Sequence, residues 1–312
     1  MISVIKQFLI NGVQDKDIKK RITCPFVINI PKRGDATSQI NFREYGDLIK
    51  IKGFIVKKTD LQILNDKKLI IEFGDSKYEI PFSFLLSMNK IENDNNTFFI
   101  EFPHNYLLNH HIPIIFLQFS SFKLKIEYIQ YLDIKLVIES TFLDVIERKT
   151  IASNIDETLY NFRCIEKFEL YLFGATDNPY NTNIFTSKID PVFLCQGIII
   201  NYPKKFINKL IISSDFGDQK LIIMEYNEDL TQIYGCPIGF EQKLTYYGFN
   251  LEENYQSNNL VGCVNMSKLD NVIITVELKE NEDYDTPNDL IIYLSCFNTI
   301  RYKNGLCCIV YS

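Results

Sequence analysis

Histidines are the residues of this chain whose chemistry would most readily support catalysis or metal binding. There are three among the 312 residues, His104 and the adjacent pair His110 and His111. Adjacent side chains on a strand point to opposite faces, so this pair cannot easily share one metal ion. With so few histidines, no Ser-His-Asp or Cys-His catalytic arrangement can be assembled convincingly. We expect loop roles for all three, with no catalytic residue and no metal site.

The cysteines also lack the spacing of a metal site or a redox motif. No two are arranged as C-x-x-C, and several lie inside strand-like runs such as "LIIYLSCF". The opening "MISVIKQFLINGV" is weakly apolar and lacks a cleavage site, so we expect no signal peptide and a cytosolic compartment. The eight thiols are therefore expected to be reduced, and no disulfide should be required for folding. They are Cys24, Cys164, Cys195, Cys236, Cys263, Cys296, Cys307 and Cys308.

Two short polar motifs resemble functional sites without their usual context. "DFG" at Asp215 to Gly217 matches the magnesium motif of kinases, but no glycine-rich loop and no H-R-D sequence accompany it. The stretch "KENEDYD", with Glu280 and Asp283 among its carboxylates, lacks the spacing of a calcium-binding EF-hand loop. We interpret the first as a turn and the second as a solvated hairpin tip. No cofactor is expected.

The charge balance argues against a partner with many phosphates. The formal net charge is -6 and the isoelectric point is near 5.3. A basic surface is what direct nucleic-acid binding requires, so we expect no direct contact with nucleic acid.

The elements that must position these residues are predominantly strands. Runs such as "CPFVINI", "DLIKIKGFIV", "KKLIIEF" and "DNVIITVEL" are rich in β-branched residues and are separated by turn residues. "FLDVIERKTIASNIDETLYNF" is the best helical candidate. Short strands without β-α-β alternation predict sandwiches or barrels. A break near residues 130 to 140 leaves two halves, each with room for about eight strands, as in a jelly roll.

One segment has a specific pattern. Ile112 to Phe119 is almost wholly apolar and includes Pro113, which cannot donate a ladder hydrogen bond, so it predicts a bend or short helical turn that plugs a core. From Phe122 to Tyr128, apolar and charged residues alternate, which predicts a strand with one wet face.

This segment resembles the plug and strand that close the first jelly roll in major capsid proteins of nucleocytoplasmic large DNA viruses. Four further segments are similar to that family in the same order: "FREYGDLIKIKGFIV" (42–56), "FLDVIERKTIASNIDETLY" (142–160), the segment 246–278, and "LSCFNTIRYKNGLCCIVYS" (294–312). The matches depart from the family pattern at Lys149 and Ile151, and the segment 246–278 lacks two prolines.

The resemblance implies an all-β fold of two consecutive eight-stranded antiparallel jelly rolls, a double jelly roll. We expect an N-terminal arm at residues 1–22, a first roll at 23–135 and a second roll at 136–312, with a joint at about 130–150.

The resemblance also implies roles for particular residues. Asp144, Glu147 and Arg148 are expected in the joint, where a charge network would fix the orientation of the two rolls. The alternative is a surface helix with i,i+3 and i,i+4 pairs. The remaining motif residues are expected at bends and turns: Gly46, Asp47, Gly262 and Asn265.

The function implied is structural. The chain would be a major capsid protein, or a smaller capsid-like paralogue, that forms homotrimers of pseudo-hexagonal outline in an icosahedral shell. Neighbouring capsomers and minor capsid proteins would be its partners, the inner viral membrane is a further candidate, and the virion, assembled in the host cytoplasm, would be its location. Two alternatives remain, an assembly scaffold like that of poxviruses and a carbohydrate-binding jelly-roll module.

Overall fold

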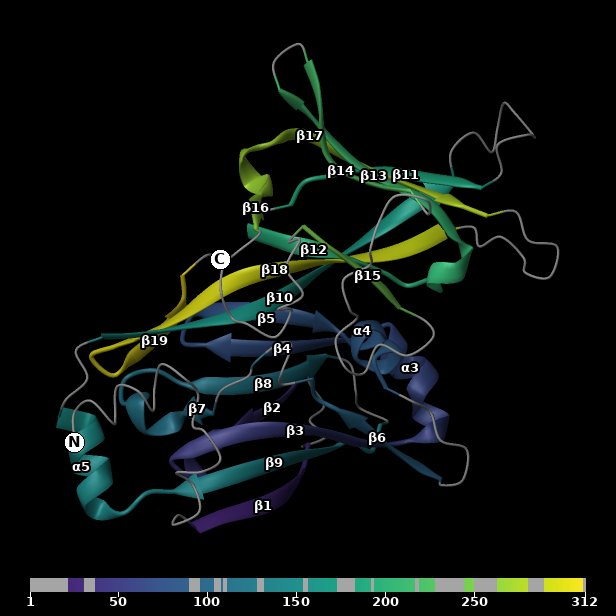
Figure 1. The fold of residues 1–312 in the computed structure, drawn as a ribbon. Coiled ribbons are helices and arrows are strands. Elements are labelled where there is room, and N and C mark those ends of the chain that lie inside the picture. Colours follow the sequence, from purple (N-terminus) through teal and green to yellow (C-terminus); the bar gives the residue numbers. More distant parts are fainter. Residues whose placement is uncertain are drawn as a thin grey trace. The chain divides into compact units, whose positions relative to one another are not determined.

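Strands make up most of the described chain, as the abundance of Ile, Phe and Tyr predicts (Figure 1). The computed structural model describes residues 22–30, 37–89, 96–103, 108, 111–127, 132–153, 157–172, 183–191, 194–216, 219–227, 244–249, 263–279 and 289–310. Within these residues, no helix is both long and apolar enough to cross a membrane.

The chain divides into two compact units, and each is described by itself. The first comprises residues 1–163 and 298–312, and the second comprises residues 164–297. Both boundaries fall inside long strands, β10 (Glu157–Leu172) and β18 (Asp289–Lys303).

The first unit contains two antiparallel sheets whose strands interleave along the chain. One has the order β1-β9-β3-β6, with β7 beside β3, and the other has the order β2-β8-β4-β5. When the two-residue strand β7 is set aside, consecutive strands alternate between the sheets except at the β4–β5 hairpin, which is the connectivity of an eight-stranded jelly roll. These strands are β1 (Ile22–Asn29), β2 (Thr37–Asn41), β3 (Leu48–Lys57), β4 (Lys68–Phe73), β5 (Ser76–Pro81), β6 (Thr97–Glu101), β7 (Ile112–Pro113), β8 (Phe122–Glu127) and β9 (Lys135–Phe142).

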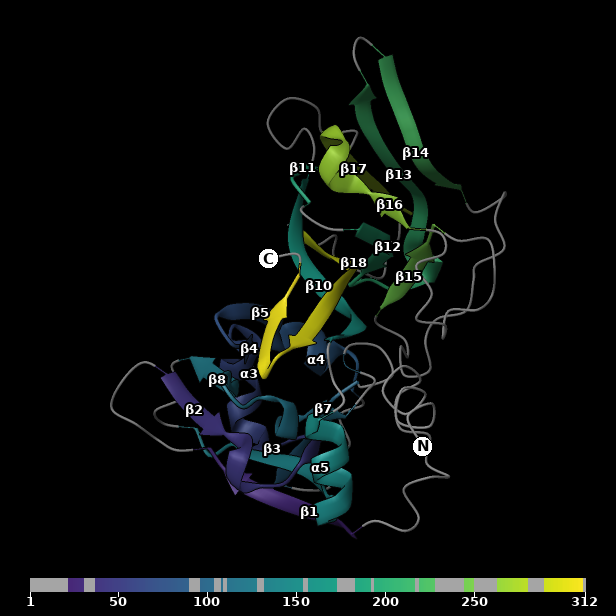
Figure 2. The same ribbon diagram turned by 90° about the vertical axis from the view of Figure 1, so that its left-hand side faces the viewer.

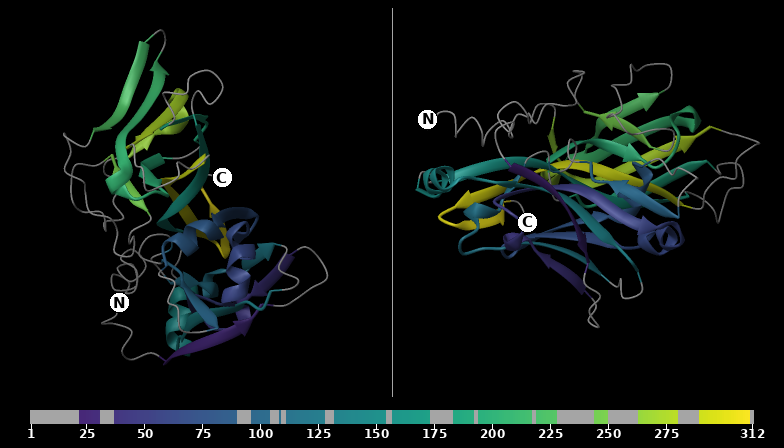
Figure 3. Two further views of the ribbon diagram at one scale, coloured as in Figure 1. Left: turned by 90° about the vertical axis from the view of Figure 1, so that its right-hand side faces the viewer. Right: turned by 90° about the horizontal axis from the view of Figure 1, so that it is seen from below.

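The remaining strands repeat this order. The order β14-β13-β17-β11-β10-β18-β12-β15 contains the two four-stranded groups of a second jelly roll, joined where β11 pairs with β10. The long hairpin β13–β14 is drawn in green (Figures 2 and 3). The strands are β11 (Ile184–Ile189), β12 (Leu194–Ile200), β13 (Ile207–Phe216), β14 (Gln219–Asn227), β15 (Thr245–Gly248), β16 (Val264–Asn265), β17 (Asp270–Leu278) and β19 (Leu306–Ile309). The prediction of an all-β double jelly roll is confirmed.

Short helices occupy the connections. The α-helices are α3 (Leu61–Asn65), α4 (Phe82–Ser87) and α5 (Val145–Ser153), and the 3-10 turns are η1 (Phe42–Glu44), η2 (Lys58–Asp60), η3 (Ile114–Phe116), η4 (Lys204–Phe206) and η5 (Met266–Lys268). The helix predicted after residue 142 is confirmed as α5. The helix α4 was not predicted: it begins at Phe82, directly after β5, and buries both Phe82 and Phe84.

The predicted plug and wet-faced strand are confirmed. Pro113 ends the two-residue strand β7, the turn η3 follows, and Ile114 and Phe116 are buried. In β8, Phe122 and Leu124 are buried while Lys123 between them is not.

The domain boundary differs from the one expected at residues 135 and 136. β9 begins there, yet it pairs with β1 and β3 at the centre of a sheet of the first unit. The last strand, β19, also belongs to the first unit rather than the second. Strand pairing decides the assignment of β9, and the packing of β19 beside β4 and β5 supports its assignment to the first unit.

Candidate functional site

Asp47 connects separate segments at one end of the first roll. Its backbone N–H donates to the carbonyl of Thr141 in β9 (3.2 Å), and its own carbonyl accepts from the N–H of Ile115 in the plug (3.1 Å). Its carboxylate oxygen Oδ2 accepts from the N–H of Leu143, at 2.8 Å. Asp47 is only 9% exposed, so its polar groups are satisfied by these hydrogen bonds rather than by water.

The same carboxylate oxygen binds Arg148 of α5. Arg148 Nε lies 3.0 Å and Nη2 lies 2.9 Å from Asp47 Oδ2. The Asp47 side chain is 12% exposed and that of Arg148 is 48% exposed, so the pair is buried on one side only. The structure therefore brings together two residues from separate sequence motifs, and it anchors α5 to the start of β3.

Asp144 and Glu147 cap α5. Asp144 Oδ1 accepts from the N–H of Glu147 at 2.7 Å, and Glu147 Oε2 accepts from the N–H of Asp144 at 3.3 Å. This reciprocal arrangement is a capping box, which satisfies the first amides of a helix. All of these contacts, and the Asp47–Arg148 pair, lie within the first unit. A role for the three residues in orienting the two rolls stays a prediction.

Arg43 holds the other end of the plug. Its Nη2 donates to the carbonyls of Leu117 (2.8 Å), Gln118 (3.2 Å) and Ser120 (3.0 Å). Arg43 and Asp47 come from one motif, "FREYGDL", and both bind the plug. This contact gives a physical reason why these two segments occur together in the resemblance.

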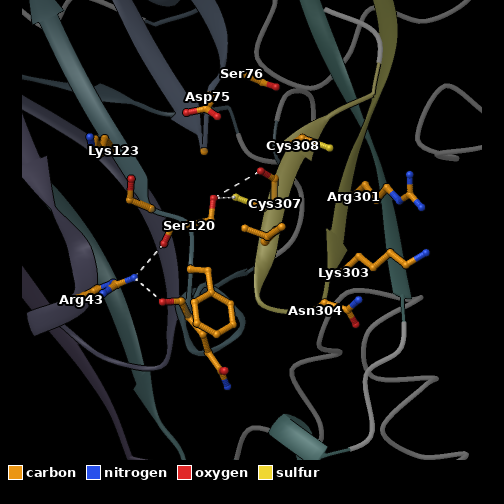
Figure 4. A pocket seen from close by; sticks show the side chains of 15 residues that line it. Arg43, Asp75, Ser76, Ser120, Lys123, Arg301, Lys303, Asn304, Cys307 and Cys308 are labelled. Atoms are coloured by element: carbon orange, nitrogen blue, oxygen red, sulfur yellow. Dashed lines mark hydrogen bonds between the residues drawn. The ribbon is translucent and has the colours of Figure 1, made fainter.

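An open hollow of about 790 Å³ lies beside this plug. The C-terminal hairpin forms one wall: the N–H of Phe119 donates to the carbonyl of Gly305 (2.9 Å), and the Oγ of Ser120 lies 3.4 Å from the Sγ of Cys307. Burial raises the pKa of the Cys307 thiol to about 11. A side chain at Gly74 would meet the carbonyl oxygen of Cys307 at 2.5 Å. The hairpin therefore packs tightly against the first roll (Figure 4).

Two of the cations that line the hollow, Arg301 and Lys303, are already engaged. Arg301 and Lys303 extend away from Arg43 (Figure 4). Arg301 Nε lies 2.8 Å and Lys303 Nζ lies 3.3 Å from the carboxylate of Glu157. The hydrogen bonds from Lys303 and Arg301 hold the pKa of Glu157 below its usual range. We therefore interpret the hollow as a seam that anchors the end of the chain, with no ligand assigned to it.

The predicted turn residues have varied surroundings. Gly46 has a φ of +144°, and a Cβ there would lie 3.1 Å from the Cβ of Ser140. Asn265 ends β16, where its Oδ1 accepts from the hydroxyl of Ser267 at 2.7 Å. Gly262 lies outside the described residues.

The second roll contains a counterpart of the plug that the sequence did not reveal. β16 pairs with β12 as β7 pairs with β3, and each is followed by a 3-10 turn. Pro113 has φ -82° and ψ 86°, and Asn265 has φ -79° and ψ 87°. The two segments share only a few apolar positions, such as Ile114 and Met266, so the repeat is clear from backbone geometry and weak in the sequence.

Among the histidines, only His111 lies in the described part of the chain; His104 and His110 lie outside it. His111 Nε2 is 3.8 Å from the carboxylate of Glu139, which also pairs with Lys52 at 2.9 Å. Burial, reinforced by the charges of Lys50 and Lys52, lowers the pKa of His111 to about 4. Burial opposes ionisation of Glu139, but the hydrogen bond and charge of Lys52 lower its pKa. His111 is therefore neutral at ordinary pH.

The other polar motifs occupy ends of strands. Asp215 and Phe216 end β13, and Gly217 lies outside the described residues, as does the acidic stretch from Glu280 to Asp285. Within the described residues, no group of three or more His, Cys, Asp or Glu is arranged to hold a metal ion.

No protein-family model matches the sequence, and no curated protein matches it. Solved structures do resemble it. The match to VP54 of PBCV-1 has a TM-score of 0.67 at 13% identity and covers 94% of this chain and 98% of that chain. A quasi-atomic model of the PBCV-1 virus capsid gives 0.65 at 13% identity with the same coverage. The Faustovirus major capsid protein gives 0.57 at 7% identity, with 89% and 90% covered.

At such low identities the likeness is evidence of shared fold, and it extends over nearly the whole chain rather than one roll. The chain therefore has the double jelly-roll fold found in these viral capsid proteins.

Proposed function

We propose that the chain is a structural capsid protein, either a major capsid protein or a smaller capsid-like paralogue, located in the virion. The observation that carries this proposal is the presence of two jelly rolls with the same strand order in one chain. The solved structures that share this architecture over most of their length are viral capsid proteins. In such a protein the work is done by broad interfaces rather than by a catalytic cleft.

The proposed unit of assembly is a homotrimer. Two similar rolls in each chain give three chains around a threefold axis six similar outer faces, a closed arrangement that can still tile a plane. Neighbouring capsomers, minor capsid proteins and the inner viral membrane are the proposed partners, without direct contact to nucleic acid. Assembly in the host cytoplasm belongs to the same proposal.

Light scattering on the purified chain tests this proposal. A trimer has a mass of about 110 kDa, three times the 36.5 kDa of one chain, and negative-stain images should show hexagonal outlines. A chain that stays monomeric at micromolar concentration contradicts the capsomer. Binding to a glycan array by such a monomer would favour the carbohydrate-binding module instead. Presence of the trimer in immature particles and its loss from mature ones would favour an assembly scaffold.

A further inference from the structure

Three cysteine thiols meet in the core of the second unit. Cys195 in β12 and Cys296 in β18 are fully buried, and Cys164 in β10 is 2% exposed. β10, β18 and β12 are neighbours in the sheet, with β18 in the middle. Hydrogen bonding with Cys164 and Cys195, together with burial, raises the pKa of the Cys296 thiol well above its usual value. The three sulfur atoms are therefore close enough to interact.

Two of these thiols are directly opposite each other. In the antiparallel pair of β12 and β18, Cys195 is the partner of Cys296. Opposite residues in such a pair have Cα atoms about 4.5–5.5 Å apart and side chains on the same face. Disulfides span Cα separations of about 4.4–6.8 Å. The backbone thus already has the spacing that a disulfide needs.

We propose that Cys195 and Cys296 are an oxidation site, which closes to a cross-strand disulfide when a small organic disulfide is present. One cysteine thiolate attacks the small disulfide, forms a mixed disulfide and releases one small thiol. The second cysteine then attacks its partner's sulfur and releases the other small thiol. The two cysteines lose two electrons and two protons, and the small disulfide gains them.

The two cysteines of β19 are poorer candidates for such a bond. Cys307 and Cys308 are consecutive in β19, where the first is buried and the second is exposed, so they point to opposite faces. Cys164 is the third thiol of the cluster, but its strand β10 pairs with the other side of β18. Cys195 and Cys296 are opposite partners in the register of β12 and β18.

The bond would hold β12 to β18 and close a loop of roughly 100 residues, and long loops are where a cross-link restricts the unfolded chain most. Because both thiols are buried, reaction requires local opening, which makes oxidation slow. In a reducing cytosol the pair stays reduced. The bond would form after a particle leaves the host cell. This timing rests on the proposed function, whereas formation of the bond itself does not.

Thiol mapping on the purified full-length chain tests the proposal. The chain is incubated with oxidised glutathione or with a phosphine reductant, unfolded, alkylated, digested without reduction and analysed by mass spectrometry. We expect oxidation to remove two alkylatable thiols and to produce one peptide linking Cys195 to Cys296. Alkylation of both cysteines after oxidation, or a link from Cys296 to Cys164, overturns the proposal.

Variants make the test specific. Cys296→Ser should abolish the linked peptide, whereas Cys164→Ser and the exposed control Cys308→Ser should retain it. If Cys296→Ser fails to fold, the wild-type map still decides. The oxidised wild type should also melt at a higher temperature than the reduced form, and a bond without that rise would overturn its stabilising role. The trimer mass is measured separately, so the disulfide map can be interpreted even if the capsid proposal fails.

Discussion

A single residue, Asp47, links the start of β3 with the end of β9 and the plug through its backbone, and with α5 through its carboxylate. The sequence identified Asp47 and Arg148 as motif residues but did not predict that they pair, because they are 101 positions apart. It also placed Asp144 and Glu147 in a network with Arg148 and did not predict that the two carboxylates bind each other's backbone N–H groups as a helix cap. Local capping can be predicted from spacing along the chain, but the partner of a charged side chain depends on tertiary contacts.

Replacing Asp47 should destabilise the first roll more than replacing Arg148. Asp47→Ala leaves the buried N–H of Leu143 without its acceptor, and we expect a loss of about 2–3 kcal/mol in the free energy of unfolding. Arg148→Met keeps the side-chain stem but removes a half-exposed charge, and we expect about 1 kcal/mol. Urea denaturation measures both losses. The control is Lys149→Met, at the exposed neighbouring position of the same helix.

A double-mutant cycle separates the two contributions. If Arg148 acts through Asp47, the double variant should lose less stability than the two single losses added together. Strictly additive losses would show that Arg148 stabilises the roll through other contacts.

His111 should make stability depend on pH. Its pKa falls from 6.5 in the unfolded chain to about 4 in the folded protein, so between these values the unfolded state binds more protons. Stability is then complete above pH 6.5 and is lost as the pH falls towards 4, by up to about 3 kcal/mol. Urea midpoints across this range measure the slope, and His111→Gln should flatten it. If His111→Gln leaves the slope unchanged, the pH dependence arises from other groups, such as Glu139, whose pKa is also lowered.

At the scale of elements, sequence periodicity predicted those strands and turns whose residues carry the signal in their own local pattern. The alternation from Phe122 and the break at Pro113 correctly predicted β8 and the plug. The helix α4 was missed, because Phe82 and Phe84 continue the apolar pattern of the strand before them. The correspondence between η5 and the plug was missed as well, since Asn265 reproduces the backbone angles of Pro113 without any shared side-chain chemistry.

Gly53 should be intolerant of a side chain. It lies at the register shift of β3 against β9, and a Cβ there would lie 2.2 Å from the carbonyl oxygen of Ile100 and 2.7 Å from the ring of Phe99. Because backbone cannot yield as a side chain can, Gly53→Ala should cost about 2–4 kcal/mol. Gly248→Ala is the matched control, since its Cβ would meet only the Tyr246 ring, at 3.0 Å. Equal thermal midpoints for the two variants would contradict this explanation.

At the scale of the whole molecule, the sequence predicted two jelly rolls but divided the chain at the wrong strand. A boundary at residue 135 treats β9 as the opening of the second roll, because "DIKLVIES" looks the same in either sheet. Strand pairing is what assigns it to β1 and β3. The local sequence pattern also does not predict that the hairpin of β18 and β19 packs in the first unit, because its contact with Ser120 joins residues 187 positions apart.

The difference between the boundary expected at residue 135 and the observed division of the chain predicts which fragment can fold. Residues 22–163 joined by a short Gly/Ser linker to residues 298–312 contain every strand of the first unit, and the hydroxyl of Thr299 lies 2.9 Å from Asn161 Oδ1, so the linker has little distance to span. We expect this fragment to unfold cooperatively, with a β-type circular dichroism spectrum. Residues 22–135 lack β9, which pairs with both β1 and β3, so the sheet cannot form and this fragment should stay unfolded. Cooperative unfolding of residues 22–135 alone would restore the boundary expected from the sequence. Loss of structure in the linked fragment would instead show that the first roll needs strands from residues 164–297.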